Sequence, residues 1–279
     1  MKKAIVVGGL NLDICGLPDG ELVPRDSNIG RVEMRAGGVG HNIAARLAQL
    51  GVEVELVTAI GDDAAAVMLR EQLRREGVGV SLALQMHGPS CCYVSLHDAD
   101  GDMAAAVNAM ALMERFTPED LPLDAINACG LCIADTNLPP AVLHALAERA
   151  RIPLMLDTVS CAKAERACGV IGRFYAVKPN AAEAAMLSGE SDPARAAAWF
   201  LAQGTEHVFI SLGARGVYAA GKSFFGFLPA PKLSVRNATG AGDAMAAGIA
   251  SALLEGLDTR SCALRGMETA SRYLSGHQA

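Results

Sequence analysis

The chain has 279 residues, of which 51% are hydrophobic and 19% charged, with a formal net charge of −6. This length can bury the core of one large domain. Basic residues are scattered singly, which argues against a nucleic-acid polymer as partner. No apolar run approaches the ~20 residues of a membrane span, and a short apolar strand stands where a cleavable signal would. We therefore expect a cytoplasmic protein without a membrane partner.

Eight cysteines lie mostly among apolar or small neighbours, where reduced thiols serve as packing residues. Cys129 and Cys132 have a spacing that also occurs in redox and zinc sites. No second pair at zinc-finger spacing accompanies them, so we expect packing roles here too.

Predicted strands and helices alternate through most of the chain. Residues 4–7 are continuously apolar, which is typical of a strand buried on both faces, and residues 38–50 have helical spacing. Further strands are predicted at 54–57, 131–134, 154–156, 175–177 and 208–211. Further helices are predicted at 67–76, 139–150, 181–187, 193–202 and 241–254. This alternation predicts an α/β domain with a mostly parallel sheet.

Two regions interrupt the alternation, at about residues 13–36 and 89–108. In the second, two short apolar runs flank a turn at 98–101, as in a β-hairpin. No repeat or low-complexity linker divides the chain, so we expect a single domain over 1–279 with these regions inserted as a small β lid. Exposed lid strands favour pairing with a second copy, which leaves a homodimer as an open expectation.

A run of small residues that ends in a carboxylate opens the helix predicted at 241–254. The run consists of Thr239, Gly240, Ala241, Gly242 and Asp243. Backbone N–H groups are free at the start of a helix and its dipole favours an anion, so the turn can hold a phosphoryl group. Asp243 could then take the proton of an incoming hydroxyl, as phosphoryl transfer requires. A glycine turn in which Asp243 only caps the helix is the alternative.

A glycine pair follows the first strand. Gly8 and Gly9 let the chain turn sharply off the strand end. This turn places Asn11 and Asp13 over the carboxyl edge of the sheet, where open α/β folds bind ligands. Both side chains can hydrogen-bond sugar hydroxyls. An Asx turn that only stabilises its own loop is the alternative.

A second glycine pair precedes the helix at 38–50. The missing side chains of Gly37 and Gly38 allow a ligand to approach the backbone, and Asn42 lies on the first helical turn. A plain glycine turn is the alternative.

A later helix start carries groups suited to a metal. Asn180 and Glu183 face the same side of this helix and can hold waters around Mg²⁺, although a capping box explains the same spacing. A turn containing Gly213 and Gly216 follows the strand at 208–211.

Taken in order, these motifs resemble those of the ribokinase-like, or PfkB, carbohydrate kinases. The matching runs are Gly8–Asp13, Gly37–Asn42, Asn180–Glu183, Ser211–Gly216 and Asn237–Asp243, so the resemblance spans nearly the whole chain. It implies a ribokinase-like three-layer fold, with a central mostly parallel sheet flanked by helices and a small β lid. It also implies an ATP-dependent kinase that uses Mg²⁺.

The resemblance implies roles for individual residues as well. Asp243 would be the catalytic base, beside an anion hole at Gly240, Ala241 and Gly242. Substrate contacts are implied for Asn11, Asp13, Gly37, Gly38 and Asn42. Nucleotide contacts are implied for Asn180, Ser211, Gly213, Gly216, Thr239, Gly240 and Gly242, and water-mediated Mg²⁺ contacts for Asn180 and Glu183.

Within the family, several stretches are similar to pseudouridine kinases, which phosphorylate the 5′-hydroxyl of a C-glycosidic nucleoside. They include Asp26–Asn28, Val107–Asn108 and Asp157–Ser160. Ser27 and Asn28 have donors and acceptors suited to a uracil-like edge, and Asn108 would also contact the substrate. Ordinary loop roles for these residues are the alternative.

Two positions depart from the pattern of that subfamily, since Ala109 and Thr158 stand where Asp and Pro are expected. Asn237 is a further likeness to the subfamily, because it replaces the more usual Asp that opens the family signature. That Asp belongs to a monovalent-cation site in many relatives, so potassium activation is an open alternative rather than an expectation.

Other functions fit the sequence less well. A nucleotide-binding dehydrogenase would need G-x-G-x-x-G opening a helix, and Gly8–Asp13 lacks this spacing. A ligand sensor without catalysis would be expected to lose the base or the anion hole, and both are present. Another sugar or nucleoside kinase, acting on ribose, a fructose-type sugar, adenosine or uridine, is the main alternative, because fold does not define substrate.

Overall fold

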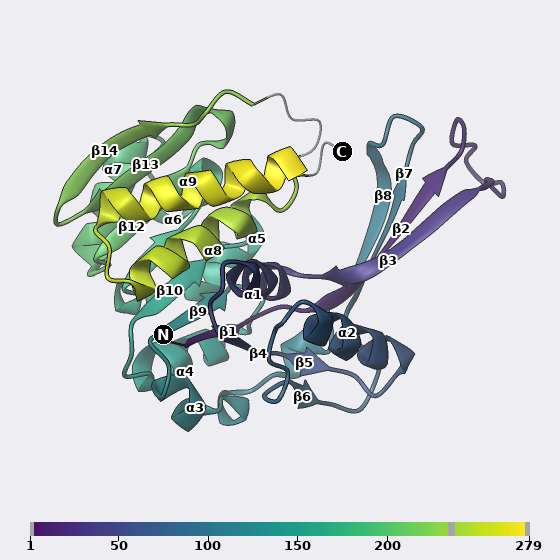
Figure 1. The fold of residues 1–279 in the computed structure, drawn as a ribbon, viewed down its shortest axis with the longest axis horizontal. Helices are drawn as coiled ribbons and strands as arrows, with labels where there is room; N and C mark the ends of the chain where they lie inside the picture. The colour runs from purple at the N-terminus through teal and green to yellow at the C-terminus, as the bar shows by residue number, and fades with distance from the viewer. Residues whose placement is uncertain (1–2, 234–237, 277–279) are drawn as a thin grey trace.

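A computed structural model of the chain describes residues 3–233 and 238–276. Its main body is a twisted sheet between two layers of helices, and a second sheet projects from this body (Figure 1). Asn237 lies outside the described residues. Within the described ranges, no helix is both long and apolar enough to cross a membrane.

The central sheet has eight strands in the order β14-β13-β12-β11-β10-β9-β1-β4. Neighbours from β12 to β4 pair in parallel, whereas β13 pairs antiparallel with both β12 and β14. The strands are β1 (Ala4–Val7), β4 (Val54–Val57), β9 (Leu131–Asp135), β10 (Leu154–Asp157), β11 (Ala176–Lys178), β12 (His207–Ser211), β13 (Gly216–Gly221) and β14 (Phe224–Pro229).

Helices cover both faces of this sheet, as the sequence predicts. One face packs against α1 (Val39–Gln49), α2 (Ala64–Arg75), α8 (Ala241–Leu254) and α9 (Thr259–Gly276). The other packs against α3 (Leu123–Asn127), α4 (Pro140–Arg149), α6 (Ala181–Ser188) and α7 (Pro193–Gln203). Shorter helices are α5 (Cys161–Ala164) and the 3₁₀ turns Met113–Arg115, Pro118–Asp120, Glu165–Ala167, Ile171–Arg173 and Gly213–Arg215.

Strand β1 shows why the central strands read as continuous apolar runs. Ala4 and Val6 point into the core shared with α1 and α8, whereas Ile5 and Val7 point into the core on the opposite face. All four side chains are fully buried. A strand covered on both faces needs no polar position.

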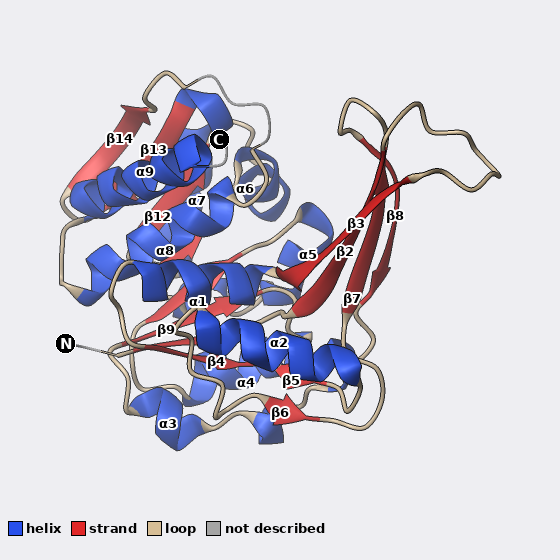
Figure 2. Ribbon diagram, turned by 45° about the vertical axis from the view of Figure 1, so that its right-hand side comes forward, coloured by secondary structure: helices blue, strands red, loops and turns tan. Residues whose placement is uncertain are grey.

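The projecting sheet has four strands in the order β3-β2-β7-β8 (Figure 2). These strands are β2 (Asn11–Pro18), β3 (Gly30–Gly37), β7 (Cys92–His97) and β8 (Met103–Ala109). The interrupting segments of the sequence therefore meet here, through a parallel β2–β7 pair and two antiparallel pairs. A separate two-stranded ladder joins β5 (Ala59–Ile60) and β6 (Leu84–Gln85).

Candidate active site

The turn before α8 requires a glycine at residue 240. Gly240 has φ 81°, and a Cβ there would lie 2.6 Å from the Tyr273 hydroxyl oxygen, so glycine is required on both counts. The Ala241 N–H donates to Ala238 O at 3.2 Å. The N–H groups of Gly242 and Asp243 lie in the first turn of α8, where backbone amides generally lack an intrahelical acceptor. These two amides are therefore the ones suited to an anion.

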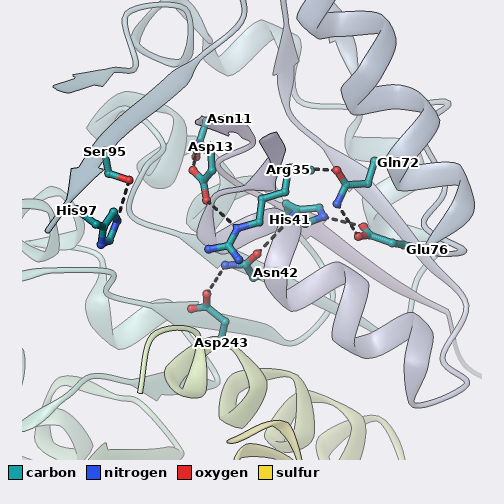
Figure 3. A network of polar contacts seen from close by, with 11 residues as sticks. Asn11, Asp13, Arg35, His41, Asn42, Gln72, Glu76, Ser95, His97 and Asp243 are labelled. Carbon is teal, nitrogen blue, oxygen red and sulfur yellow. Dashed lines mark hydrogen bonds and ion pairs between the residues drawn. The ribbon is translucent and has the colours of Figure 1, made fainter. Parts of the chain in front are cut away.

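A residue 201 positions earlier in the sequence holds the Asp243 side chain. Asn42 Nδ2 on α1 donates to Asp243 Oδ2 at 2.7 Å (Figure 3). Burial, with a smaller contribution from Asp157, raises the pKa of Asp243 to about 7. The Asn42 hydrogen bond and the positive charge of Lys178 oppose this rise in pKa. A carboxylate with such a pKa can exchange a proton near neutral pH.

Three charged residues end neighbouring central strands beside Asp243. They are Asp135 on β9, Asp157 on β10 and Lys178 on β11, and all are buried. Lys178 Nζ lies 3.0 Å from Asp157 Oδ2. Burial alone would lower the pKa of Lys178, but Asp157 and the surrounding carboxylates hold it above its ordinary value. No role was predicted for these residues from sequence, although a charged residue that ends a buried apolar strand is a usable signal of a site.

Asp135 explains the first glycine pair. Its carboxylate accepts from Gly9 N at 2.9 Å and Asn137 N at 2.8 Å. Cβ atoms at Gly8 and Gly9 would lie within 2.7 Å of the Asp135 and Asn137 side chains. Neither glycine has positive φ, so these glycines make room for packed side chains rather than allowing a sharp turn. Burial raises the pKa of Asp135 to about 6.

Asn11 and Asp13 lie together at the root of the projecting sheet. Asn11 Nδ2 donates to Asp13 Oδ1, and Arg35 Nε on β3 lies 4.0 Å from Asp13 Oδ2 (Figure 3). A Cβ at Gly37 would lie 2.2 Å from Asp13 Oδ2. The Asp13 carboxylate therefore occupies the space that a side chain at residue 37 would need. Gly38 has φ 96° and sits against Gly9 O.

Strand register places Asn108 in the same row as Asp13. Asp13 pairs with Tyr93 on β7, and Tyr93 pairs with Asn108 on β8. Directly opposed residues share one face of a sheet, so Asp13, Tyr93 and Asn108 share a face.

Ser27 and Asn28 lie elsewhere, in the loop that joins the outer ends of β2 and β3 (Figure 2). Asn28 Oδ1 accepts from Val23 N at 2.8 Å, and Asn28 Nδ2 donates to Val23 O and Asp26 O. The amide of Asn28 is thus engaged within its own loop, and the structure does not bring either residue to Asp243.

A pocket of about 670 Å³ adjoins the Gly242 side of the helix start. Sequence-predicted nucleotide residues Ser211, Gly213, Gly216 and Gly242 line it, with Met245 and Met267 on its apolar side. Gly213 and Gly216 have positive φ, and a Cβ at Gly216 would strike Leu228 O. This combination of small and apolar walls beside free amides suits a nucleotide.

Asn180 and Glu183 form a capping box at the start of α6. Glu183 N donates to Asn180 Oδ1, and Asn180 N donates to Glu183 Oε2, both at 2.9 Å. Asn180 Nδ2 donates to Glu183 Oε1, and Thr158 Oγ1 to Glu183 Oε2. Across the described ranges, no cluster of three or more His, Cys, Asp or Glu residues could hold a metal directly. Glu183 fits contact with a metal-bound water, since Oε1 accepts a single hydrogen bond.

The first-turn amides of α8 and the Asp243 carboxylate meet at the carboxyl edge of the sheet, an arrangement that suits a small-molecule phosphotransferase. The sequence pattern of the "pfkB family carbohydrate kinase" matches residues 1–279. The chain belongs to this family, whose members transfer a phosphoryl group to an alcohol.

Individual relatives agree with this assignment. A pseudouridine kinase of Escherichia coli is 35% identical over 263 residues, which cover 91% of this chain and 84% of that protein. A solved carbohydrate kinase from Agrobacterium tumefaciens is 32% identical with a TM-score of 0.87, covering 97% of this chain and 90% of its own. Arabidopsis thaliana ribokinase, solved with ribose and ATP, shares the fold at 22% identity and a TM-score of 0.84, covering 98% and 93%. The predicted ribokinase-like fold is confirmed.

Proposed function

We propose that the protein transfers the γ-phosphoryl group of ATP to the 5′-hydroxyl of a ribosyl nucleoside, with pseudouridine as the first candidate. The observation that carries this proposal is the Asp243 carboxylate, set at the start of α8 and held by Asn42. The Asp243 carboxylate thereby lies beside both the proposed anion site and the proposed binding site of the acceptor hydroxyl.

The acceptor sugar is proposed to bind between α1 and the projecting sheet. Asn11 and Asp13 offer hydrogen-bonding groups at the root of this sheet, and Asn108 shares a sheet face with Asp13. We propose that the projecting sheet acts as a lid, which closes over the sugar and excludes water from the reaction.

The chemistry follows from the placement of charge. Asp243 in its ionised form accepts the proton of the 5′-hydroxyl as that oxygen attacks the γ-phosphorus, and the bond to the ADP oxygen breaks. The amides of Gly242 and Asp243 stabilise the transferring group. ATP is proposed to occupy the pocket lined by Ser211, Gly213 and Gly216.

The side chains of Asn180 and Glu183 hydrogen-bond to each other in a capping box. Mg²⁺ is therefore proposed to contact them through its water ligands rather than directly. When bound, the ion would neutralise charge on the nucleotide phosphates.

The choice of pseudouridine is supported by the 35% identity to the Escherichia coli pseudouridine kinase. One observation favours a second candidate, another sugar or nucleoside kinase of the family. Asn28 is predicted from sequence to contact the base. In the structure its side-chain amide instead hydrogen-bonds to Val23 and Asp26 within the loop. Base contacts by Ser27 and Asn28 stay a prediction that requires the loop to rearrange.

The test is an ADP-release assay with pseudouridine, uridine, adenosine, ribose and fructose as acceptors. We expect the highest kcat/KM with pseudouridine and a product phosphorylated at the 5′ position. An Asn28→Ala variant should raise KM for pseudouridine and leave KM for ribose unchanged. Preference for ribose or fructose would overturn the nucleoside assignment and leave the kinase intact.

A further inference from the structure

Lys178 stands between the two proposed binding sides of the sheet edge. It is the last residue of β11, which lies between β10 and β12 in the central sheet. The nucleotide pocket is on the β12 side, because Ser211 ends that strand and lines the pocket. The proposed acceptor groups are on the other side, because Asn11 lies shortly after β1, beyond β10 and β9. A group that passes from the nucleotide to the acceptor therefore crosses the ends of β10 and β11.

The ammonium of Lys178 reaches the first turn of α8. A Cβ at Gly242 would lie 3.4 Å from Lys178 Nζ, which is an ordinary contact distance. Gly242 provides one of the two amides suited to an anion, and it lines the nucleotide pocket. Asp243, the next residue, is one of the carboxylates whose charge acts on Lys178. The ammonium, the Gly242 amide and the Asp243 carboxylate thus lie close together.

Negative charges outnumber positive ones at this point. Within residues 3–233 and 238–276, Lys178 is the one lysine or arginine that is buried. Its charged neighbours are Asp157, Asp243 and Glu183. A phosphoryl group brings further negative charge to this position, and like charges repel strongly in a buried site. An ammonium beside the phosphoryl group offsets that repulsion.

Lys178 also has hydrogen-bond donors left for a ligand. An ammonium has three N–H donors. In the described part of the chain, Asp157 Oδ2, at 3.0 Å, is the one carboxylate oxygen within ion-pair distance of Nζ. The Lys178 side chain keeps 6% of its surface accessible. A ligand oxygen can therefore accept from Lys178 while the ion pair with Asp157 stays in place.

We propose that Lys178 is a catalytic residue, whose ammonium donates a hydrogen bond to the γ-phosphoryl group during its transfer. This inference rests on the proposed function, because it assigns Lys178 to the same reaction. As the acceptor oxygen bonds to the γ-phosphorus, the bond to the β,γ-bridging oxygen breaks and its electron pair leaves with ADP. The acceptor proton goes to Asp243, and Lys178 keeps its own protons. A charge-assisted hydrogen bond stabilises the phosphoryl group in transit.

One pair of variants separates this role from the other effects of Lys178. Lys178→Met alone removes a charge that lowers the pKa of Asp243 and leaves Asp157 buried without its partner. The double variant Asp157→Asn with Lys178→Met also removes the charge of Asp157, which raises the pKa of Asp243. The two effects on Asp243 therefore oppose each other, and neither member of the ion pair is left alone.

Asp157→Asn alone is the matched comparison, because it retains the ammonium. Asp157 Oδ1 accepts from Val159 N at 2.9 Å, and the side-chain oxygen of Asn can accept the same hydrogen bond. Both variants keep this contact, so they differ only in the side chain at residue 178.

The first measurement is kcat at pH 9, with saturating ATP and the acceptor that the ADP-release panel selects. Because the pKa of Asp243 is about 7, the base is ionised at this pH. We expect kcat of the double variant to be about 10²-fold below that of Asp157→Asn, as for the loss of one donor to a reacting group. Unfolding midpoints establish that both proteins are folded at the assay temperature. A difference below about tenfold overturns the proposal, because Lys178 would then act only as the counterion of Asp157.

A second measurement needs no acceptor. Titration calorimetry compares the Kd for AMP-PNP, an ATP analogue whose γ-phosphoryl group is not transferred, with the Kd for ADP. We expect the preference for AMP-PNP over ADP to be about tenfold smaller in the double variant than in Asp157→Asn. A preference that differs by less than about threefold contradicts a contact between Lys178 and the γ-phosphoryl group. If no acceptor in the panel yields ADP while this preference falls as expected, the proposed function fails and the contact of Lys178 stands.

Discussion

The carboxylate of Asp243 draws its properties from residues distant in sequence. Asn42 lies 201 positions away, and Asp157 and Lys178 end two central strands. The motif around Asp243 could be predicted from sequence, because small residues before a helix indicate an anion site. Its partners could not, since strand order decides which side chains meet at the sheet edge.

The pKa of Asp243 predicts the pH dependence of the reaction. Because burial raises this pKa to about 7, the ionised base is lost as pH falls through 7, and kcat/KM should drop about tenfold per pH unit below about pH 6. ADP-release rates between pH 5.5 and 9 measure this limb. A profile that is flat down to pH 5.5 would show that Asp243 does not act as the base.

Lys178→Met tests how the buried charge of Lys178 affects Asp243 and the stability of the fold. Its charge opposes the raised pKa of Asp243, so its loss should move the acid limb to higher pH. Asp157 would also lose its ion-pair partner in a buried site, which should lower the free energy of unfolding by about 3 kcal/mol. Urea unfolding measures the loss. Lys222→Met removes an exposed ion pair with Glu206 and serves as the control, and equal losses in both variants would contradict the account.

At the scale of elements, strands and helices with large apolar side chains could be predicted, with ends displaced by a few residues. The longest missed elements are β13, β14 and α9. Strands β13 and β14 contain glycines at 216, 221 and 226, and β14 ends at Pro229. This composition is typical of loops. Helix α9 buries mainly small residues such as Cys262, Ala263 and Gly266, so few large apolar side chains mark its buried face.

The end of β3 borders the proposed acceptor site, and Gly37→Ala tests this placement. The added Cβ would lie 2.2 Å from Asp13 Oδ2, so the carboxylate must move. We expect KM for the acceptor to rise at least about tenfold, with KM for ATP unchanged. Initial-rate kinetics in both substrates measure this difference. Gly20→Ala, where nothing lies within 4 Å, is the matched control, and an unchanged acceptor KM in Gly37→Ala would remove Asp13 from the site.

At the scale of the whole molecule, the projecting sheet has two unlike faces. One carries Asp13 and Asn108, whereas cross-strand pairs place large apolar side chains on the other. The exposed members of this apolar face are Val32, Met34, Val94, Leu96 and Val107. A patch of this kind marks an interaction surface, and a second copy offers the same apolar chemistry.

We therefore expect dimers that pair through this apolar face. Light scattering after size exclusion should give twice the 28.9 kDa mass of the chain, and Val94→Lys with Val107→Lys should give monomers. Val67→Lys on α2, where the valine is 71% exposed outside the sheet, should remain dimeric. A monomeric wild-type protein at micromolar concentration would contradict this expectation.

Asp243 is the proposed base of this kinase. The direct measurement compares wild type with Asp243→Asn, a near-isosteric change, in acceptor-dependent ADP release and in ATP binding by calorimetry. Loss of the base should lower kcat by about 10³-fold or more while the Kd for ATP stays within about threefold. Near-normal turnover in Asp243→Asn would contradict the account.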